Sequence, residues 1–570
     1  MDQYDKSPEA PMSESERLKI QGDYLRGTIA KGLQDSVTGS ISADDNALLK
    51  FHGAYQQDDR DLRVARQKQK LEPAYQFMVR VRLPGGVCTP VQWLALDTLA
   101  RSHANGTLRL TSRQTFQLHG VLKHNLKATI GGINDTLLTT VATCGDVNRN
   151  VMCHPNPHRS GVHGKVHGLC AQLSEHLLPR TRAYHEIWLG DERVAGTRAQ
   201  DAEPLYGAQY LPRKFKITVA VPPSNDVDVL AHDLGFIAIV EDDQLAGFNI
   251  AVGGGMGMTH GDTTTFPRLA DVIGFCTPDQ VIAAAEAVIG LQRDAGDRGD
   301  RRHARFKYTV ERLGLEAVRQ ELERRCGWRL APPRPFRFTH TGDRLGWDED
   351  ADGYHSFTVH IPSGRIADSA ARRLMSGLRE IAEIHVGDFR LTPNQNVTVC
   401  RIPTEHRGKI AAKIAEFGLD SADNETALHR NALSCVALPT CGLAMAESER
   451  FLPDLLHQID QVIVACGLRE RPISVRVTGC PNGCVRPYLA EIGLVGKSPG
   501  RYNLYLGGSS TGDRPNRLYR EAVSAKALCD VLRPIIQHYA CAGDTDEPFG
   551  DFVVRTGYVA HPRSGPEFHG

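Results

Sequence analysis

The sequence predicts a mixed α+β fold that is built from two related halves. Two observations lead to this prediction: short stretches recur in the same order, and strand-like segments alternate with helix-like ones in each half. At 570 residues, the chain has room for about three or four domains of roughly 150 residues each. Lys plus Arg and Asp plus Glu balance at 67 each, so the overall charge does not favour a nucleic-acid binder.

The recurring stretches define the two halves. In each half a strand-like stretch ends in Pro and two small residues, and a helical pattern follows it. An Arg-Leu-Thr segment then comes 25 residues after the Pro in one copy and 28 residues after it in the other. The matching pairs are Val81-Arg-Leu-Pro-Gly-Gly86 with Val359-His-Ile-Pro-Ser-Gly364, Arg109–Phe116 with Arg390–Val397, and, more loosely, Phe248–Gly254 with Tyr502–Gly508.

These repeats predict the domain boundaries. Residues 1–75 are polar and lack a clear period, which indicates an irregular N-terminal arm. Residues 76–143 and 344–418 hold the paired strand–helix–strand units. Residues 144–343 and 419–570 are the two larger α/β modules, and only the second carries the paired cysteines described below.

Local signals place the main elements in order. Gly85-Gly86 closes a strand that starts at Phe77, and a helical pattern runs from Pro90 to His103. The later strands and helices are predicted at Tyr210–Val221 and Phe248–Gly257 (strands), and at Pro278–Arg293, Val310–Arg325, Ala446–Cys466 with an interruption near Pro453, and Lys526–Tyr539 (helices).

Polar donors alternate along the stretch from Arg109 to His119. If this stretch is a strand, period two places them on one face and apolar residues on the other. A solvated strand face is common, but it does not need so many Arg, Thr and Gln donors. Guanidinium groups fit carboxylates, so the pattern favours a surface for a polyanionic ligand. The donor residues are Arg109, Thr111, Arg113, Thr115, Gln117 and His119.

Two basic pairs lie on other predicted strands. Arg80 and Arg82 are two residues apart, as are Lys214 and Lys216, so the members of each pair are predicted to share a face. Adjacent ammonium groups repel each other unless they are solvated or face an anion. Surface lysines are usually only solvated, so the lysine pair alone is weak evidence for an anion site.

Four cysteines late in the chain have the spacing of a metal centre. Cys435 and Cys441 form a C-x5-C motif, Cys480 and Cys484 form a C-x3-C motif, and 38 residues separate the pairs. Proline and glycine beside these cysteines permit tight backbone around a ligand. Four thiolates with this spacing favour an iron–sulfur cluster. Structural zinc, which usually takes tighter knuckles, and unrelated buried thiols are the alternatives.

Other features narrow the cellular context. No apolar run approaches the length of a membrane span, and the polar N-terminus resembles neither a signal peptide nor a transit peptide. The 14 cysteines are therefore expected to be reduced thiols in a cytoplasm. The Gly253–Gly257 segment does not fit the dinucleotide-binding fingerprint, because Met258 occupies the last glycine position.

Over nearly its full length the chain resembles the siroheme-containing sulfite and nitrite reductases. Within that family it is most similar to the haemoprotein (beta) subunits of NADPH-dependent assimilatory sulfite reductases. Besides the cysteine motifs, the matching stretches are Tyr24–Ala30, His52–Arg60, Arg82–Gly86, Arg109–Gly120, Asn148–Asn150, Leu178–Tyr184 and Leu211–Lys216.

The resemblance implies a duplicated, pseudo-twofold scaffold of three domains, with ferredoxin-like half-domains at 76–143 and 344–418 and siroheme at the domain junction. It implies a [4Fe–4S] cluster on Cys435, Cys441, Cys480 and Cys484, with Cys484 also bridging to the siroheme iron. Siroheme is rich in carboxylates, which accounts for the donors from Arg109 to His119. The resemblance implies that Arg213 binds the cofactor together with those donors. It implies that four cations bind the substrate: Arg80, Arg149, Lys214 and Lys216.

The implied activity is the six-electron reduction of sulfite to hydrogen sulfide in sulfate assimilation and cysteine biosynthesis. We expect Lys214 and Lys216 to supply protons, and Arg80 and Arg149 to bind the anion. Because the chain shows no convincing flavin or nicotinamide motif, electrons are expected from NADPH through the FAD and FMN of a flavoprotein alpha subunit. The arm before residue 75 is a candidate contact for that partner.

The chain departs from the family pattern at three positions. Val485 follows Cys484 where a small residue is usual, Pro487 lies two residues further on, and Gly442 follows Cys441 where close relatives have Pro. These changes remove no ligand, but they affect the backbone around the cluster. Two alternative functions remain open: a ferredoxin-dependent sulfite or nitrite reductase, and a structural protein stapled by zinc.

Overall fold

The computed structural model describes residues 12–180, 187–189, 192–195 and 203–569, and of 187–189 and 192–195 the backbone alone. The first eleven residues of the predicted arm and residues 181–184 of the Leu178–Tyr184 stretch lie outside the described residues. Within the described part, no helix is both long enough and apolar enough to cross a bilayer.

The helices of the described chain have the following bounds: α1 Glu14–Gln21, α2 Ile29–Gln34, α3 Ala43–Leu49, α4 Arg63–Lys68, α5 Pro90–His103, α6 Leu126–Asn134, α7 Gly161–His176, α8 Val281–Ala295, α9 Phe306–Leu313, α10 Leu315–Cys326, α11 Leu374–Ile384, α12 Thr404–Phe417, α13 Ala427–Arg430, α14 Leu452–Ala465, α15 Leu528–Ala542 and α16 Phe549–Arg555.

The strands are β1 Ala54–Asp58, β2 Tyr75–Arg80, β3 Val87–Cys88, β4 Leu108–Leu110, β5 Phe116–Val121, β6 Ile187–Leu189, β7 Glu192–Ala195, β8 Ile217–Ala220, β9 Leu234–Glu241, β10 Gln244–Val252, β11 Asp271–Cys276, β12 Gly346–Glu349, β13 His355–Val359, β14 Arg365–Ile366, β15 Asp388–Leu391, β16 Val397–Ile402, β17 Ala432–Ser434, β18 Val475–Thr478, β19 Ile492–Ser498, β20 Arg501–Leu506 and β21 Arg517–Ser524.

The two strand–helix–strand units form a pair in which each completes the sheet of the other. One sheet has the order β1-β2-β5-β4-β14, and the other has the order β12-β13-β16-β15-β3. The short strands β14 and β3 thus come from the opposite half, with Arg365 opposite Arg109 and Val87 opposite Arg390. Their helices α5 and α11 pack together, and Trp93 stacks on Phe389 with ring centroids 4.5 Å apart. The predicted duplication is therefore confirmed.

Glycine is required where the two half-domains cross. Gly86 and Gly364 have φ angles of 77° and 71°, in the left-handed region. A Cβ atom on Gly86 would lie 2.4 Å from the carbonyl oxygen of Leu391, and one on Gly364 would lie 2.4 Å from that of Leu110. The symmetry of these two contacts explains why the Pro-Gly-Gly and Pro-Ser-Gly stretches recur.

Replacing Gly364 with alanine is expected to cost about 3 kcal/mol of stability. The free-energy cost of a left-handed alanine and the cost of the overpacked contact add together. Gly106 is a matched control: its φ is 79°, and no heavy atom of the described residues lies within 4 Å of its added Cβ. Gly106→Ala should cost only about 1 kcal/mol. Equal shifts of the thermal midpoint in the two variants would contradict the close crossing.

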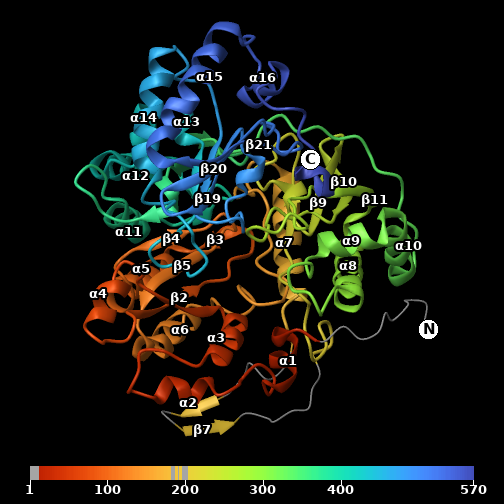
Figure 1. Cartoon of the computed structure of the whole chain (residues 1–570), viewed down its shortest axis with the longest axis vertical. Helices are drawn as coiled ribbons and strands as arrows, with labels where there is room; N and C mark the ends of the chain where they lie inside the picture. Colours follow the sequence, from red (N-terminus) through yellow and green to blue (C-terminus); the bar gives the residue numbers. More distant parts are fainter. Residues whose placement is uncertain (1–11, 181–186, 190–191, 196–202, 570) are drawn as a thin grey trace.

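The two α/β modules share one strand topology. In the first sheet, β8 is parallel to β9, and β10 and β11 then continue antiparallel. In the second sheet, β18 is parallel to β19, followed by antiparallel β20 and β21, with β17 added beside β18. The modules lie at the upper and right-hand parts of Figure 1, and the paired half-domains lie at the left and lower left.

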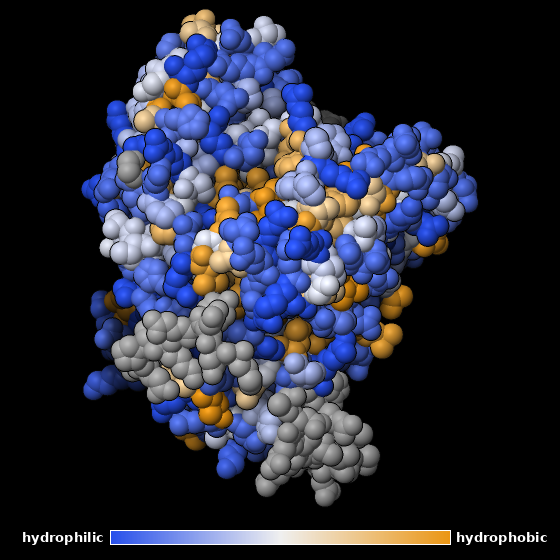
Figure 2. All heavy atoms as spheres, turned by 90° about the vertical axis from the view of Figure 1, so that its right-hand side faces the viewer, coloured by the Kyte–Doolittle hydropathy of each residue, from blue (hydrophilic) through white to orange (hydrophobic). Residues whose placement is uncertain are grey.

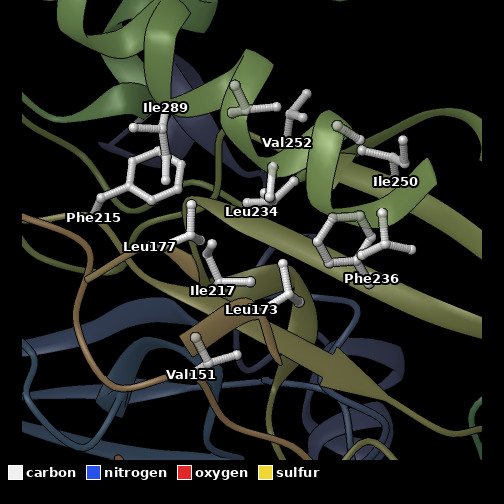
Figure 3. Close-up of a cluster of buried hydrophobic side chains, with 14 of the residues drawn as sticks. Val151, Leu173, Leu177, Phe215, Ile217, Leu234, Phe236, Ile250, Val252 and Ile289 are labelled. Atoms are coloured by element: carbon white, nitrogen blue, oxygen red, sulfur yellow. The ribbon is translucent and has the colours of Figure 1, made fainter. Parts of the chain in front are cut away.

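The core of the first module is made by side chains of its sheet and of α7 and α8. Figure 3 shows Ile217, Leu234, Phe236, Ile250 and Val252 from β8, β9 and β10 facing Leu173 of α7 and Ile289 of α8, all of them buried. The outer surface seen in Figure 2 is mainly hydrophilic, with hydrophobic side chains gathered near the middle of that face. The half-domain pair and the second module each have a separate apolar core.

The described part of the arm is more ordered than the sequence indicated. It contains α1, α2 and α3, and β1 pairs with β2, so the first half-domain sheet begins before residue 76. The prediction of an irregular arm was wrong for these residues. Helix α1 is short and strongly polar, yet Glu16 and Lys19 are buried by contacts with residues far along the chain. Local periodicity does not contain that information.

The prediction of one continuous strand from Arg109 to His119 was also wrong. The segment is a hairpin, in which β4 and β5 pair with Arg109 opposite Gln117. The hydroxyl of Thr111 accepts hydrogen bonds from the backbone N–H groups of Arg113 and Thr115 at 3.2 and 3.3 Å, which closes the turn. Gln114 takes a φ of 52° inside it. The second copy has the same turn at Thr392–Asn396.

Several element boundaries differ from the predicted ones. Lys214 and Lys216 precede β8, which starts at Ile217, and Arg82 lies beyond β2. Helices α9 and α10 divide at Gly314, whose φ is 81°. Pro453 lies in the first turn of α14, so it starts that helix rather than interrupting it. The predicted helix from Pro90 to His103 is confirmed.

Candidate functional site

The four cysteines lie in two loops at one edge of the second module. Cys435 directly follows β17, and Cys480 and Cys484 lie in the loop after β18; the two strands are parallel neighbours, so these loops meet. The backbone N–H of Gly479 points at Cys435 Sγ at 3.3 Å, and the side-chain amide of Asn482 points at Cys480 Sγ at 3.5 Å. N–H groups directed at sulfur are typical of thiolates that hold a cluster.

The four sulfurs are close enough to affect one another. Burial, and then the neighbouring Cys484, raise the pKa of the Cys435, Cys441 and Cys480 thiols, that of Cys480 to about 11. Ionised thiolates there need a positive centre to offset their mutual repulsion. Within the described residues, no three His, Cys, Asp or Glu side chains are gathered as ligands of a single metal ion.

The predicted donor residues lie together on the β4–β5 hairpin, but they are not equally free to bind a ligand. Arg109 is buried, pairs with Glu449 and donates to the carbonyl of Ser434 at 2.9 Å. The hydroxyls of Thr111 and Thr115 lie 2.6 Å apart. The polar groups of these three residues already have partners within the protein. The residues therefore hold the hairpin in shape as well as offering donors.

Other donors of the same set are buried without a partner. Among the described residues, Nε and Nη1 of Arg113, Nε of Arg80 and Nδ1 of His119 have no hydrogen-bond acceptor. Gln117 contacts His119 at 3.3 Å. Orphaned buried donors cost free energy unless a bound acceptor satisfies them. The donors fit a large, carboxylate-rich ligand such as siroheme.

The four predicted cations are brought together. Arg80 and Arg149 both donate to the carbonyl of Thr143, at 3.3 and 2.9 Å, so their guanidinium groups are neighbours. Burial lowers the pKa of Arg149 below its usual value, and Arg80 lowers it further. The structure thus places two buried guanidinium groups side by side.

The two lysines lie in the same cationic region. Burial, together with the neighbouring Arg213 and Arg305, lowers the pKa of Lys214 to about 7. Burial and the charge of Lys214 lower the pKa of Lys216 well below its usual range. Several desolvated cations lie in this region, and a small anion bound among them would reduce their mutual repulsion.

Cys484 joins the cysteines to the cations. It is the sulfur that shifts the pKa of each of the other three cysteines, and it also raises the pKa of both Lys214 and Arg80. Cys484 is exposed, and its carbonyl accepts a hydrogen bond from Ser112 at 3.0 Å. The hairpin, the cations and the cysteine loops therefore converge at this residue.

Sequence reasoning missed the buried charges behind this site. Asp146 accepts two hydrogen bonds from Arg301, at 2.8 and 3.0 Å, and lies 3.8 Å from Lys19 and 3.9 Å from Arg213. Burial opposes ionisation, but these three cations together lower the pKa of Asp146 below its ordinary value. Asp146 lies three residues before Arg149, but its partners are far along the chain, so spacing could not reveal its role.

Asp146→Asn is expected to cost about 3 kcal/mol of stability, because it leaves Arg213 and Arg301 without their buried counter-charge and Lys19 with Glu16 alone. Asp294→Asn provides the control, since its pairs with Arg293 and Arg325 are partly exposed and worth under about 1 kcal/mol. Thermal denaturation of both variants measures the difference. If the two midpoints fall equally, the buried network does not support the site.

A second missed residue connects the arm to the cysteine loop. Arg60 donates to the carbonyls of Cys441 and Ala444 at 3.2 and 2.5 Å, and its backbone N–H donates to the carbonyl of Pro439 at 3.2 Å. Arg60 lies in a stretch that matched the family, but no local pattern indicates a partner 380 residues later.

The three departures from the family pattern lie in different surroundings. Val485 is buried, and Arg486 after it takes a φ of 57°. Pro487 opens a one-turn 3₁₀ helix, η9, Pro487–Leu489. Gly442 has open space around it, with no heavy atom of the described residues within 4 Å of an added Cβ.

Comparison with known proteins gives consistent matches. The family model "Nitrite/Sulfite reductase ferredoxin-like half domain" matches residues 68–134 and 348–417, and the model "Nitrite and sulphite reductase 4Fe-4S domain" matches residues 171–330, in the first of the two α/β modules. The chain is 58% identical over 566 residues to the "Sulfite reductase [NADPH] hemoprotein beta-component" of Geobacillus kaustophilus, covering 99% of each chain. It is 55% identical over 564 residues to the protein of the same name from Bacillus subtilis, again covering 99% of each.

A solved structure shares the fold. The Mycobacterium tuberculosis NirA protein superposes with a TM-score of 0.79 over 96% of this chain and 97% of that one, at 23% sequence identity. At this identity the likeness concerns the fold alone.

Proposed function

The chain belongs to the nitrite and sulfite reductase family, within the group of NADPH-dependent sulfite reductase haemoprotein beta-components, and on this basis we propose how its residues reduce sulfite to sulfide. The observation that carries the proposal is the position of Cys484, which lies within electrostatic reach of the other three cysteines and of the cations Arg80 and Lys214.

We assign Cys435, Cys441, Cys480 and Cys484 to a [4Fe–4S] cluster, with Cys484 also holding the siroheme iron. When bound, the cluster and siroheme supply the electrons. The free donors of Arg113, Arg80 and His119 support this assignment, because a macrocycle bearing carboxylates gives them acceptors. Arg109, Thr111, Thr115, Gln117 and Arg213 complete the proposed cofactor-binding set, with Arg109 acting mainly through Glu449 and Ser434.

We assign the substrate to the cations. Arg80 and Arg149 are neighbouring guanidinium groups that suit the oxygens of a small anion. Lys214, whose pKa lies at about 7, can lose and regain a proton at neutral pH. Loss of oxygen from sulfite as water needs such protons. Arg80 and Arg149 therefore orient the anion, and Lys214 and Lys216 hold the protons.

The electrons are proposed to come from NADPH through the FAD and FMN of a flavoprotein alpha subunit. The names of the relatives support a partner that uses NADPH. The chain's own sequence lacks a convincing dinucleotide-binding fingerprint, and we place the complex in the cytoplasm, where its 14 cysteines stay reduced.

Steady-state assays test this function against the ferredoxin-dependent alternative. Sulfite and nitrite are offered in turn, with electrons from NADPH plus the flavoprotein or from reduced ferredoxin. The proposal expects sulfide production from sulfite with NADPH and flavoprotein. Turnover with ferredoxin alone, or a higher kcat/KM for nitrite than for sulfite, would favour the alternative.

A further inference from the structure

The molecule contains a second pocket, at the place in the other half that corresponds to the proposed active site. Two one-turn helices fix the correspondence: η5, Val229–Ala231, and η9. Asp228 and Arg486 precede these helices, both with left-handed φ angles, of 48° and 57°. Counting back two residues from each places Asp226 where the other half has Cys484.

The same correspondence extends through the half-domain sheets. Thr358 pairs with Thr398 as Arg80 pairs with Gln117, and the turn at Thr392 copies the turn at Thr111. Thr358 thus stands in the place of Arg80, and Asn394, the third residue of its turn, in the place of Arg113. Strand β18 is equivalent to strand β8. Counting back from equivalent residues of these two strands places Ser474 where the first half has Lys216, and Pro472 where it has Lys214. None of these four replacements is a cation, although Arg390 keeps the charge of Arg109.

Carboxylates lie on the floor of this second pocket instead. The cavity has a volume of about 220 Å³ and is lined by residues that include Asp226 and Asp343. Asp343 accepts hydrogen bonds from Asn394 at 2.9 Å, from Asn396 at 2.8 Å and from Thr392. Its three donors belong to the turn itself, so the carboxylate is held in place.

Asp226 is the unsatisfied group. It is 3% exposed, and its Oδ1 has no hydrogen-bond partner among the described residues. Burial and the neighbouring Asp343 raise the pKa of Asp226 to about 7. A buried carboxylate oxygen without a donor is costly, and a ligand that brings a positively charged donor would remove the cost.

The mouth of the pocket carries the opposite charge. Arg159 and Arg344 both line the opening and are exposed to solvent, and Arg344 lies 3.1 Å from Asp348. His340 also lies there, and burial and Arg159 lower its pKa, so it is neutral at pH 7. The pocket is therefore negative at its floor and positive at its rim, which matches a ligand with an ammonium group and a carboxylate close together.

We propose that this pocket binds a small α-amino acid, with its ammonium group at Asp226 and Asp343 and its carboxylate at Arg159 and Arg344. The ammonium group would lie beside Asp226 and Asp343, which both line the cavity, and would reduce the repulsion between the two carboxylates. The rim guanidinium groups would bind the carboxylate. The cavity, at about 220 Å³, has room for a ligand of this size.

Calorimetric titration of the purified full-length protein with L-alanine tests the proposal. Ethylamine and propionate each carry half of the charges of alanine. We expect alanine to bind at least tenfold more tightly than either half, and added sulfite not to displace it. Absence of alanine binding, ethylamine binding as tightly as alanine, or displacement by sulfite would each overturn the proposal.

Two variants locate the site. Asp226→Asn removes the unpartnered charge with little change of shape, so the chain should fold, and alanine affinity should fall at least tenfold. Asp352→Asn, an exposed carboxylate outside the cavity, should bind alanine like the parent. Arg159→Gln at the surface provides a second test: it should weaken alanine at least fivefold and leave ethylamine unchanged. Unchanged alanine affinity in Asp226→Asn or Arg159→Gln would place the ligand elsewhere.

Discussion

Replacing Cys484 with serine is expected to abolish sulfite reduction, the largest single effect that the structure predicts. Cys484 lies within electrostatic reach of the other cysteines, of Arg80 and of Lys214. A serine hydroxyl has nearly the same size but is a poor ligand for iron. We expect the purified variant to lose siroheme absorption together with activity, because the residue is assigned to both cofactors.

Cys541→Ser is the matched control, since Cys541 is an exposed thiol near the end of α15. It should keep both the absorption spectrum and the rate. A Cys484→Ser variant that retains siroheme and reduces sulfite at the parent rate would show that another residue links the cofactors to the cations.

Replacing Lys214 with methionine is expected to lower kcat for sulfite by about a hundredfold, the range that a positioned proton donor contributes. Lys214→Arg keeps the positive charge but cannot release a proton at neutral pH. It should therefore retain the KM for sulfite better than the methionine variant does, while kcat stays low. Siroheme absorption of each variant must first match that of the parent. Parent-like kcat in Lys214→Met with siroheme bound would refute its role.

The pH profile tests the same residue independently. In the free enzyme Lys214 has a pKa of about 7, so it is charged below that pH and neutral above it. The neutral amine neither attracts the anion nor donates a proton, so kcat/KM should fall as pH rises through about 7. Sulfite itself titrates near neutrality, so the Lys214→Met profile, and the profile with nitrite, serve as controls. A parent profile that matches the Lys214→Met profile would contradict the assignment.

Much of the fold and of the site could be predicted from local sequence. The repeated Pro-Gly-Gly and Pro-Ser-Gly stretches mark the crossings at Gly86 and Gly364, where a side chain would collide with the other half. The spacing of the cysteines indicated a cluster because both pairs lie in short loops. The four cations were identified by the family resemblance rather than by their alternation, and the structure brings them into one buried region.

The remainder depends on contacts that sequence spacing does not encode. Arg109 pairs with Glu449, and Asp146 pairs with Arg301 and Lys19, across separations that no local period reports. The turn that Thr111 closes was missed because alternation continues through it, although a side-chain hydroxyl followed by polar residues is a turn signal. Helix α1 was missed because burial of Glu16 and Lys19 is decided by their distant partners.

The chemistry of equivalent positions is the reason why we assign the reaction to one half of the duplicated scaffold. The scaffold positions equivalent residues in both halves, so fold alone does not distinguish them. Chemistry at a few positions does: Cys484 corresponds to Asp226, and Arg80 to Thr358. One pocket has the thiolates and cations that an anion and its cofactors require, and the other has acidic groups on its floor.

The absorption spectrum of the purified protein, measured with its metal content, tests the central claim most directly. The account predicts a coloured protein with siroheme bands, iron and acid-labile sulfide, and loss of all three in Cys484→Ser. A colourless protein that contains zinc in place of iron would contradict the assignment of the four cysteines and of the sulfite site beside them.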